Sequence, residues 1–490
     1  MASEPRQVDV LDTQAAGAMV VRGGAARALG FVAGTALALI GVVLLTRHLG
    51  VALFGRYQTV ISIVTVVGVV TDLGMANLGV REYVQRSGAD RDRLMRVLLG
   101  MRISLTVLGV GLWAGFAVAA GYPTEMVAGV ALMGLGLVVL VVQTTLQIPL
   151  SAELRLGTVA TIDVGRKGLQ AGLIAALVAA GATLLPFLAV TIPVHAVLVA
   201  WTAVLVRGAV SLRPSFVLSE WIELARPALA FALAVAVGVI YLYTAQILTS
   251  LVSTERETGL FSAAFRVFVI VAGVPALLVS GALPLLSRAA VDDRARLANI
   301  VRGLFAAMLL LGGGAAVAFV AGAGPIISIV AGPGFEPAAD VLRIQGAALL
   351  LTFVIATWGF TLLAERRHRA MVYANLAALA TSLTTVGLLA ASAGAIGAAL
   401  GTLLGELVLA AGYLIALTRV NHDLAPGLGQ ALRVGVALAF AAACLLLPLP
   451  AVAVTAIALL AYVVAAYAAG AVPEDLIAQL PETLRRRLRA

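Results

Sequence analysis

The chain carries little charge for its length. Only 12% of its 490 residues are Asp, Glu, Lys or Arg, whereas 62% are hydrophobic. Soluble domains carry about 25% charged residues, so this chain has too few charges to cover a globule, and a soluble protein is excluded. A membrane-spanning helix needs about 20 mostly apolar residues, and the chain has room for more than a dozen. The composition predicts an all-α polytopic membrane protein.

The chain lacks the residue patterns that several kinds of chemistry require. The single cysteine, Cys444, excludes an intrachain disulfide. The four histidines lie far apart and match no metal-ligand spacing, and the Gly-rich stretch 322–334 lacks the Gly-Lys-Ser/Thr of a phosphate-binding loop. We therefore expect no metal, no cofactor and no ATPase. The net charge of +9 resides in short loops rather than in one polar domain, so a nucleic-acid partner is not expected either.

Apolar runs predict about fourteen spans, with soft boundaries because Gly and Pro occur inside many of them. The predicted spans are 25–46, 57–79, 97–120, 126–149, 168–184, 185–206, 228–250, 259–283, 303–323, 341–363, 371–391, 395–418, 432–449 and 451–471. Residues 1–20 lack the basic start and short apolar core of a signal peptide, so we expect no cleaved leader.

The basic residues predict the orientation of these spans. With the N-terminus placed in the cytoplasm, 28 of the 33 basic residues fall on inner loops, among them Arg102, Arg166 and Lys167. Four fall on outer loops, and Arg266 lies within a span. Cytoplasmic loops of membrane proteins are enriched in Lys and Arg. Both termini are therefore predicted to be cytoplasmic, in a bacterial inner membrane.

The spans divide into two similar halves. The second span opens with Leu53-Phe54-Gly55 and the eighth with Gly259-Leu260-Phe261, so that Gly55 matches Gly259, and an Arg-rich inner loop follows each of the two spans. Six spans per half give both halves the same orientation, a parallel repeat with a site expected between them near mid-membrane. The expected domains are a tail 1–23, a lobe 24–206, an amphipathic linker 207–227, a second lobe 228–420, two extra spans 421–471 and a basic tail 472–490.

Three segments resemble a known family. They read LTRHLGVALFGRYQTVISIVTVVGVVTDLGMANLGVREY (45–83), ETGLFSAAFRVFVIVAGVPALLVSGALPLLSR (257–288) and IISIVAGPGFEPAADVLRIQGAALLL (326–351). The first is similar to the opening of polysaccharide flippases, which handle O-antigen and other lipid-linked oligosaccharides, in the multidrug/oligosaccharidyl-lipid/polysaccharide exporter superfamily. The other two resemble the eighth span and the outer loop with the tenth span of those flippases.

This resemblance implies two six-helix lobes around a central cavity, alternately open to each side. It also implies a lipid-linked oligosaccharide as cargo, moved from the inner to the outer leaflet for cell-surface polysaccharide export. We expect a monomer that contacts membrane lipids, is not an enzyme, and draws energy from the membrane potential or from H⁺ or Na⁺. A lipid II flippase and a cation-coupled multidrug exporter of the same superfamily remain alternatives, and a membrane glycosyltransferase is a third.

Arg266 is the leading candidate for contact with cargo. Charges inside a bilayer are expensive and by default functional, and an arginine grips phosphate with two hydrogen bonds. A pyrophosphate-linked cargo needs such a partner. The alternative is an arginine that reaches the outer headgroups with its tip.

Two carboxylates are candidates for ion coupling. Glu406 lies midway along the twelfth span with no basic residue in that span, so we expect it to be protonated at rest. Asp72 lies late in the second span. The alternative for Glu406 is a structural hydrogen bond between helices, and for Asp72 a pairing with inner arginines.

Uncharged polar side chains and two further arginines complete the cavity candidates. Gln143 and Gln147 share one helix face, as do Tyr243 and Gln246. Such faces bind sugars or join helices, at about 1 kcal/mol per contact. Arg27 and Arg56 are placed at the two mouths of the cavity.

Overall fold

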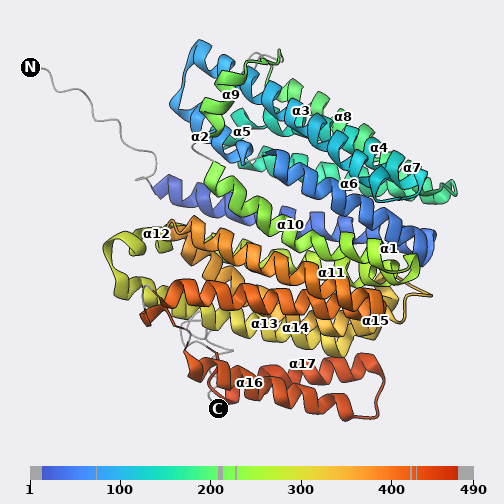
Figure 1. The fold of residues 1–490 in the computed structure, drawn as a ribbon. Coiled ribbons are helices and arrows are strands. Elements are labelled where there is room, and N and C mark those ends of the chain that lie inside the picture. The colour runs from blue at the N-terminus through green and yellow to red at the C-terminus, as the bar shows by residue number, and fades with distance from the viewer. Residues whose placement is uncertain are drawn as a thin grey trace, which may run out of the picture. The chain divides into compact units, whose positions relative to one another are not determined.

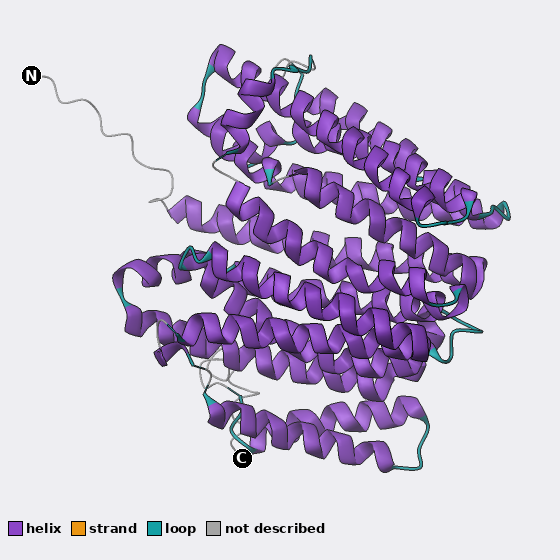
Figure 2. Cartoon of the chain, viewed as in Figure 1, coloured by secondary structure: helices purple, strands orange, loops and turns teal. Residues whose placement is uncertain are grey.

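The computed structural model describes residues 14–72, 74–207, 213–226, 229–419, 422–425 and 427–472. Within these ranges the chain forms helices and no strand, which confirms the predicted all-α class (Figure 2). Eleven helices in this part of the chain are long and apolar enough to cross a membrane. The chain therefore has the architecture of a multi-pass membrane protein.

The helices group into two compact units. Unit 1 comprises residues 1–45 and 71–228, and unit 2 comprises residues 46–70 and 229–490, each within its described part. Residues 46–70, which the sequence analysis placed in the first lobe, thus group with the second half of the chain. The reason is visible locally, because Thr46 and Arg47 donate hydrogen bonds to the carbonyl oxygens of Val330 and Ile329 (2.8 and 3.0 Å).

Helix α1 (Gln14–Asp72) begins in unit 1 and continues through unit 2. The helices that follow it in unit 1 are α2 (Met75–Gln85), α3 (Gly88–Ala119), α4 (Thr124–Leu146), α5 (Ile148–Ala152), α6 (Leu156–Ala179), α7 (Leu184–Ala189), α8 (Thr191–Leu205) and α9 (Leu218–Ala225) (Figure 1). Those of unit 2 are α10 (Leu229–Val252), α11 (Glu255–Ser280), α12 (Leu283–Asp292), α13 (Arg294–Val330), α14 (Ala338–Ala364), α15 (His368–Thr418), α16 (Leu428–Ala443) and α17 (Ala451–Ala468), with 3₁₀ turns at His422–Leu424 and Cys444–Leu446.

Two helices each contain two predicted spans. Helix α1 (Gln14–Asp72) is broken at Gly50, which has φ +69°, and α15 is broken at Gly394, which has φ +56°. Glycine adopts positive φ at little cost, so each residue allows the chain to turn between two spans. The carboxylate of Glu257 accepts a hydrogen bond from the Ala395 backbone N–H (2.9 Å) and so caps the second part of α15.

The eleven helices thus account for thirteen predicted spans. The remaining one, 168–184, falls on α6 and the turn after it. Helix α6 is not among the eleven, because it carries three charged residues near its centre, Asp163, Arg166 and Lys167. Every stretch of 18 residues within the helix contains all three and is therefore too charged to count as a spanning segment. The count of fourteen stays a prediction. Arg166 and Lys167, which were assigned to an inner loop, lie inside a helix.

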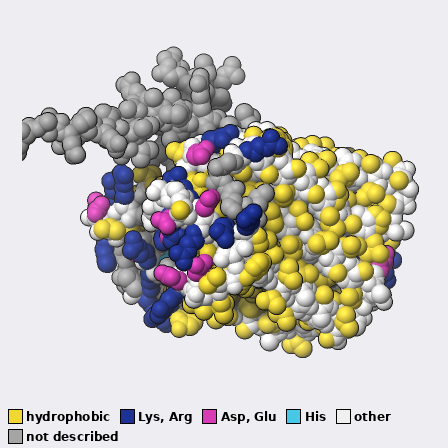
Figure 3. Space-filling view, turned by 90° about the horizontal axis from the view of Figure 1, so that it is seen from above, with side chains coloured by type: hydrophobic (Ala, Val, Ile, Leu, Met, Phe, Trp, Pro, Cys, Tyr) yellow, Lys and Arg dark blue, Asp and Glu magenta, His cyan; other side chains and the backbone are white. Residues whose placement is uncertain are grey.

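The surface matches a lipid environment. On the face seen in Figure 3, most of the visible charged side chains lie on the left, and hydrophobic side chains are spread over the rest. Leucines such as Leu112, Leu388 and Leu446 are about three-quarters or more exposed. An apolar surface of this extent on a soluble protein would mark an interface, and on a membrane helix it faces acyl chains.

In unit 2, aromatic side chains fill the core around α11, whereas alanines form much of the core around α17. Phe261, Phe265 and Phe268 are fully buried and stack along α11. Helices α16 and α17 lie side by side, and Tyr462 of α17 donates a hydrogen bond to the Leu310 carbonyl of α13 (2.7 Å) (Figure 1). These contacts hold α11, the helix that carries Arg266, and join α17 to α13.

Candidate functional site

Arg266 lies near the middle of α11, about 16 Å along the helix from Glu255 at 1.5 Å per residue. It is half-buried, and its guanidinium interacts electrostatically with the hydroxyls of Tyr57 and Tyr243. No acidic side chain forms an ion pair with it among the described residues. The deep position and the lack of an acidic partner leave this cation available to an anionic ligand.

Buried polar groups surround the turn of α11 that precedes Arg266. Gln246 of α10 is fully buried, and its amide donates to Ser262 (2.8 Å) and Thr59 (3.3 Å). Its own carbonyl oxygen has no partner among the described residues. Tyr243 packs edge-on against Phe265, with ring centroids 5.8 Å apart. The structure thus brings together three predicted residues, Tyr243, Gln246 and Arg266, on α10 and α11.

Arg56 also belongs to unit 2, but it has an acidic partner. Its Nε and Nη2 atoms donate to one carboxylate oxygen of Glu255 at 3.0 and 2.7 Å. The side chains are 25% and 48% exposed, so water screens the pair. Arg56 therefore is less available to an anion than Arg266.

Glu406 lies in a second polar cluster of unit 2. Its carboxylate, 4% exposed, accepts hydrogen bonds from the Tyr241 hydroxyl of α10 (3.1 Å) and from the Thr352 hydroxyl of α14 (3.2 Å). The preceding residue, Gly405, makes this possible, because a Cβ there would lie 2.9 Å from the Tyr241 ring. We call Tyr241, Thr352 and Glu406 the carboxyl cluster.

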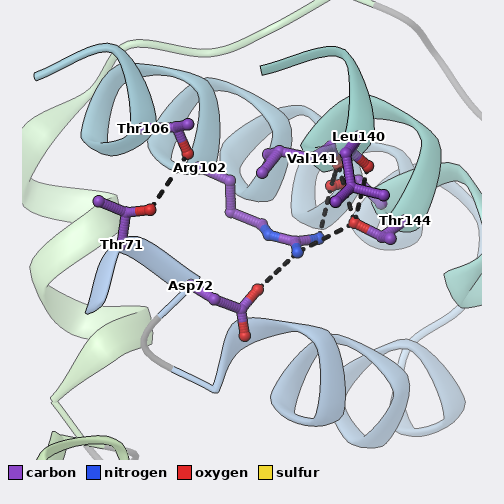
Figure 4. A network of polar contacts seen from close by, with 8 residues as sticks. Thr71, Asp72, Arg102, Thr106, Leu140, Val141 and Thr144 are labelled. Carbon is purple, nitrogen blue, oxygen red and sulfur yellow. Dashed lines mark hydrogen bonds and ion pairs between the residues drawn. The ribbon is translucent and has the colours of Figure 1, made fainter. Parts of the chain in front are cut away.

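Asp72 lies in unit 1 and is paired with a residue that sequence reasoning did not single out. Arg102 of α3 donates to Asp72 (2.5 Å), to Thr144 (3.1 Å) and to Thr145 (2.7 Å), as Figure 4 shows for the first two. The Arg102 side chain is 4% exposed and that of Asp72 is 27% exposed. A second contact joins the same two helices, because the hydroxyl of Thr71, the residue before Asp72, lies 3.4 Å from the hydroxyl of Thr106 in α3.

The ion pair explains how α1 ends. Asp72 is the last residue of α1, and α2 begins at Met75 after Gly74 with φ +69°. The pair with Arg102 ties this helix end to α3 and, through the threonines, to α4. Arg102 had been assigned to the inner side near the start of a span, but α3 begins at Gly88, so Arg102 is inside the packed bundle.

The remaining candidates also lie in unit 1. Gln143 is 2% exposed, and its amide lies 3.5 Å from the Thr202 hydroxyl. Gln147 is the C-cap residue that follows α4, and its buried amide nitrogen has no partner among the described residues. Arg27 belongs to the stretch 14–32, whose side chains the structure does not describe. No group of His, Cys, Asp or Glu in the described part of the chain is arranged to hold a metal ion.

The sequence matches one protein-family model. Residues 20–290 match the model described as "Polysaccharide biosynthesis protein". The chain belongs to this polysaccharide biosynthesis protein family. No curated protein sequence matches it significantly. The match confirms the family assignment made from residues 45–83 and 257–288, which both lie within the matched range.

Solved structures show the fold of this family member. A lipid II flippase, MurJ, in an inward closed conformation aligns with a TM-score of 0.72 at 13% identity, covering 91% of this chain and 97% of the other. A eukaryotic MATE transporter aligns at 0.60 and 14% identity, covering 82% and 95%. An inward-facing multidrug resistance MATE family transporter of the MOP superfamily aligns at 0.56 and 14% identity, covering 80% and 94%. The chain therefore has the helical fold that these structures share.

Proposed function

We propose that the chain is a flippase that moves polyprenyl-pyrophosphate-linked oligosaccharide from the inner to the outer leaflet by alternating access. The observation that carries this proposal is Arg266, a deep arginine without an acidic partner among the described residues, set among hydroxyl and amide groups. Pyrophosphate needs a cation in a low-dielectric site, and hydroxyls and amides suit the hydroxyls of sugars. The family membership and the transporter fold support the same conclusion.

A leaflet assay tests the proposal. The protein is reconstituted in liposomes with a fluorescent polyprenyl-pyrophosphate oligosaccharide, and an impermeant quencher reports how fast the label changes leaflet. We expect faster exchange than in empty liposomes, at least tenfold slower exchange for Arg266→Gln, and partial recovery for Arg266→Lys. A tenfold change corresponds to about 1.4 kcal/mol, within the range of one charge-assisted hydrogen bond.

The matched control is Arg343→Gln. Arg343 lies in α14, where it is half-exposed and pairs with Asp340 three residues earlier. Its removal is expected to leave the exchange rate within twofold of wild type. Exchange at the wild-type rate in Arg266→Gln would remove Arg266 from the route, and a wild-type protein that exchanges no lipid-linked sugar would overturn the proposed function.

We further propose that Glu406 couples transport to an ion gradient. Of the two carboxyl candidates, Asp72 is neutralised by Arg102, whereas the described neighbours of Glu406 are hydroxyls. A carboxyl buried without a cation binds a proton readily because desolvation disfavours its charge. Exchange driven by an imposed proton or sodium gradient should lose its gradient dependence in Glu406→Gln. Retention of that dependence would exclude Glu406.

Lipid II is the second candidate cargo. Between α13 and α16 lies an apolar cavity of about 190 Å³, lined by Ala316, Val317, Val320, Leu438, Ala441 and Leu445 among others. A groove of this kind is suited to an acyl or prenyl chain. The same leaflet assay with labelled lipid II decides between the cargoes, since the preferred lipid should exchange faster. A dye-efflux assay with an ion gradient tests the multidrug alternative.

A further inference from the structure

Gln345 of α14 is a fully buried amide whose hydrogen bonds are unmade. Neither its Nε2 nor its Oε1 atom has a partner among the described residues. Buried polar groups are almost always hydrogen-bonded, either to protein or to ordered water. The amide therefore calls for a small ligand that accepts from its N–H groups and also donates to its oxygen. Water does both, whereas a sodium ion would bind the oxygen and be repelled by the N–H groups.

Gln345 lies on the same face of α14 as the residue that joins this helix to the carboxyl cluster. Thr352, whose hydroxyl donates to Glu406, follows it by seven residues, which is two helical turns and about 10 Å along the axis. The start of the helix at Ala338 lies about 10 Å in the other direction. The amide is therefore halfway between the carboxyl cluster and the end of α14 that is predicted to face outward.

Small and hydroxyl-bearing side chains separate Gln345 from Glu406. Helices α14 and α15 pack against each other. On the two helix faces that carry Gln345 and Glu406, the intervening buried residues include Ala348 of α14 and Ala399 and Thr402 of α15. The Thr402 hydroxyl donates to a backbone carbonyl of its own helix (2.9 Å), which leaves its oxygen free to accept. Water molecules between the amide and the carboxylate would thus find a polar group on the way.

The groups that face Glu406 from the neighbouring helices are neutral. Helix α10 has no charged residue, and the charged residues of α14, Asp340 and Arg343, pair with each other near its start. Of the titratable groups, Tyr241 donates to Glu406 and Tyr413 interacts with it electrostatically. Within the described part of unit 2, a proton that approaches Glu406 along α14 therefore has no fixed positive charge to pass beyond Arg343.

The basic residues of the other helices packed against α14 are engaged elsewhere or lie at the far end. The Arg266 guanidinium of α11 interacts with the hydroxyls of Tyr57 and Tyr243. The remaining ones lie in the first three turns of α13 and in the first turn of α15. Both of those helix starts are at the end of unit 2 away from Gln345, because α13 leads directly into the start of α14 and α15 follows its end. These residues are Arg294, Arg296, Arg302, His368 and Arg369.

We propose that Gln345 holds water inside unit 2 and that this water conducts protons between the outer end of α14 and Glu406. A buried water needs two to four polar partners, which the amide and the neighbouring hydroxyls supply. A hydronium ion at the outer end gives a proton to the first water, and the last water gives one to a carboxylate oxygen of Glu406. Gln345 is thus a positioning residue. The inference rests on the proposed coupling role of Glu406, and it specifies the ion as a proton that arrives from one side.

Labelling of Glu406 under a pH difference tests this route. An apolar carbodiimide modifies a carboxyl group in its protonated form, and mass spectrometry of the peptide that contains Glu406 measures the labelled fraction. Helix α14, the two parts of α15, α16 and α17 give five predicted crossings, so Ala338 and the end of α17 lie on opposite sides of the bilayer. Liposomes with one protein each are captured through a C-terminal tag, so that the lumen borders the Ala338 side. Lumen and bath are then buffered at different pH values.

The wild-type labelled fraction should rise severalfold when only the lumen is acidified. Gln345→Met keeps the volume and removes both polar groups, so it should reduce this rise at least fivefold at short labelling times. Gln345→Asn keeps an amide and should retain part of the rise. The matched control is Thr357→Val, a change at a fully buried residue of the same helix on the inner side of Thr352, and it should behave as wild type does.

Three results would overturn the route. They are labelling that follows the pH of the bath, labelling that responds to sodium instead of to pH on either side, and a lumen response that Gln345→Met leaves unchanged. No cargo is present in this experiment, so its outcome does not depend on which lipid the protein moves. The leaflet assay with an imposed gradient remains the separate test of transport and of its coupling.

Thermal unfolding in detergent tests the water itself. If water pairs with the amide, Gln345→Met removes its hydrogen bonds and the Tm should fall. If the amide is dry and unpaired, its removal relieves a buried polar group without a partner and the Tm rises. Leu349→Met, at a fully buried residue one turn further along α14, shows the effect of a methionine alone. A Tm of Gln345→Met above that of wild type would contradict the proposal.

Discussion

Gly55 and Gly259, the two glycines that the predicted internal repeat aligns, lie against each other in unit 2. A Cβ on Gly55 would be 2.8 Å from the backbone nitrogen of Gly259, and a Cβ on Gly259 would overlap the carbonyl oxygen of Val51. The part of α1 that follows Gly50 therefore packs backbone to backbone against the start of α11, the helix that carries Arg266.

Gly259→Ala should destabilise the protein. The added methyl group meets backbone, which cannot turn aside as a side chain can, and overpacking of this kind costs about 1–3 kcal/mol. The control is Gly273→Ala in the same helix, where a Cβ meets nothing within 4 Å and helix propensity favours alanine by about 1 kcal/mol. Thermal unfolding in detergent should show a lower Tm for the first variant only. Equal Tm values would mean that the contact gives way without strain.

The Arg102–Asp72 pair predicts an asymmetry between its two partners. Asp72→Asn leaves a guanidinium that is 4% exposed without its counter-charge, which costs about 3 kcal/mol or more. Arg102→Met fills a similar volume and leaves a carboxylate that is 27% exposed and so reaches water. Asp72→Asn should therefore lower the Tm more than Arg102→Met. The control, Glu153→Gln at an exposed pair 3.7 Å apart, should change little. The reverse order would show that Arg102 matters mainly through its hydrogen bonds to the threonines.

The sequence predicted the helical class, most spans and the deep position of Arg266, because apolar length alone decides which segments cross a membrane. It misplaced Arg102, Arg166 and Lys167. Hydropathy locates the apolar part of a helix and not its ends, and α3 and α6 both begin well before their apolar stretches. The hydrogen-bond partners of the site residues could not be predicted from the sequence either. Tyr241 and Glu406, for example, are 165 positions apart, and only tertiary packing brings them together.

Glu365, between α14 and α15, predicts a pH-dependent stability. Burial raises the pKa of its carboxyl above the usual value, although Arg367 and Arg294 act in the opposite direction. A folded-state pKa above the unfolded one means that the group favours folding most below the unfolded pKa and less as pH rises through the folded pKa. Glu365→Gln, which mimics the protonated form, should raise the Tm at pH 7 and lose this advantage near pH 4. Glu153→Gln, on an exposed side chain, serves as the control. A variant less stable than wild type at pH 7 would show that the 3.8 Å pair with Arg367 outweighs desolvation.

The carboxyl cluster predicts a difference between two tyrosine-to-phenylalanine changes. Tyr241→Phe removes one of the two hydroxyls that donate to Glu406, and a buried acceptor left without its donor costs about 1–3 kcal/mol. Tyr373→Phe removes a hydroxyl from a side chain on α15 that is 71% exposed and should change the free energy of unfolding by less than about 0.5 kcal/mol. Thermal unfolding of both variants in detergent measures the difference. In a Glu406→Gln background the effect of Tyr241→Phe should shrink, because residues in one hydrogen-bond network are not additive. An undiminished effect there would assign the role of Tyr241 to its packing on Gly405 instead of to the bond with Glu406.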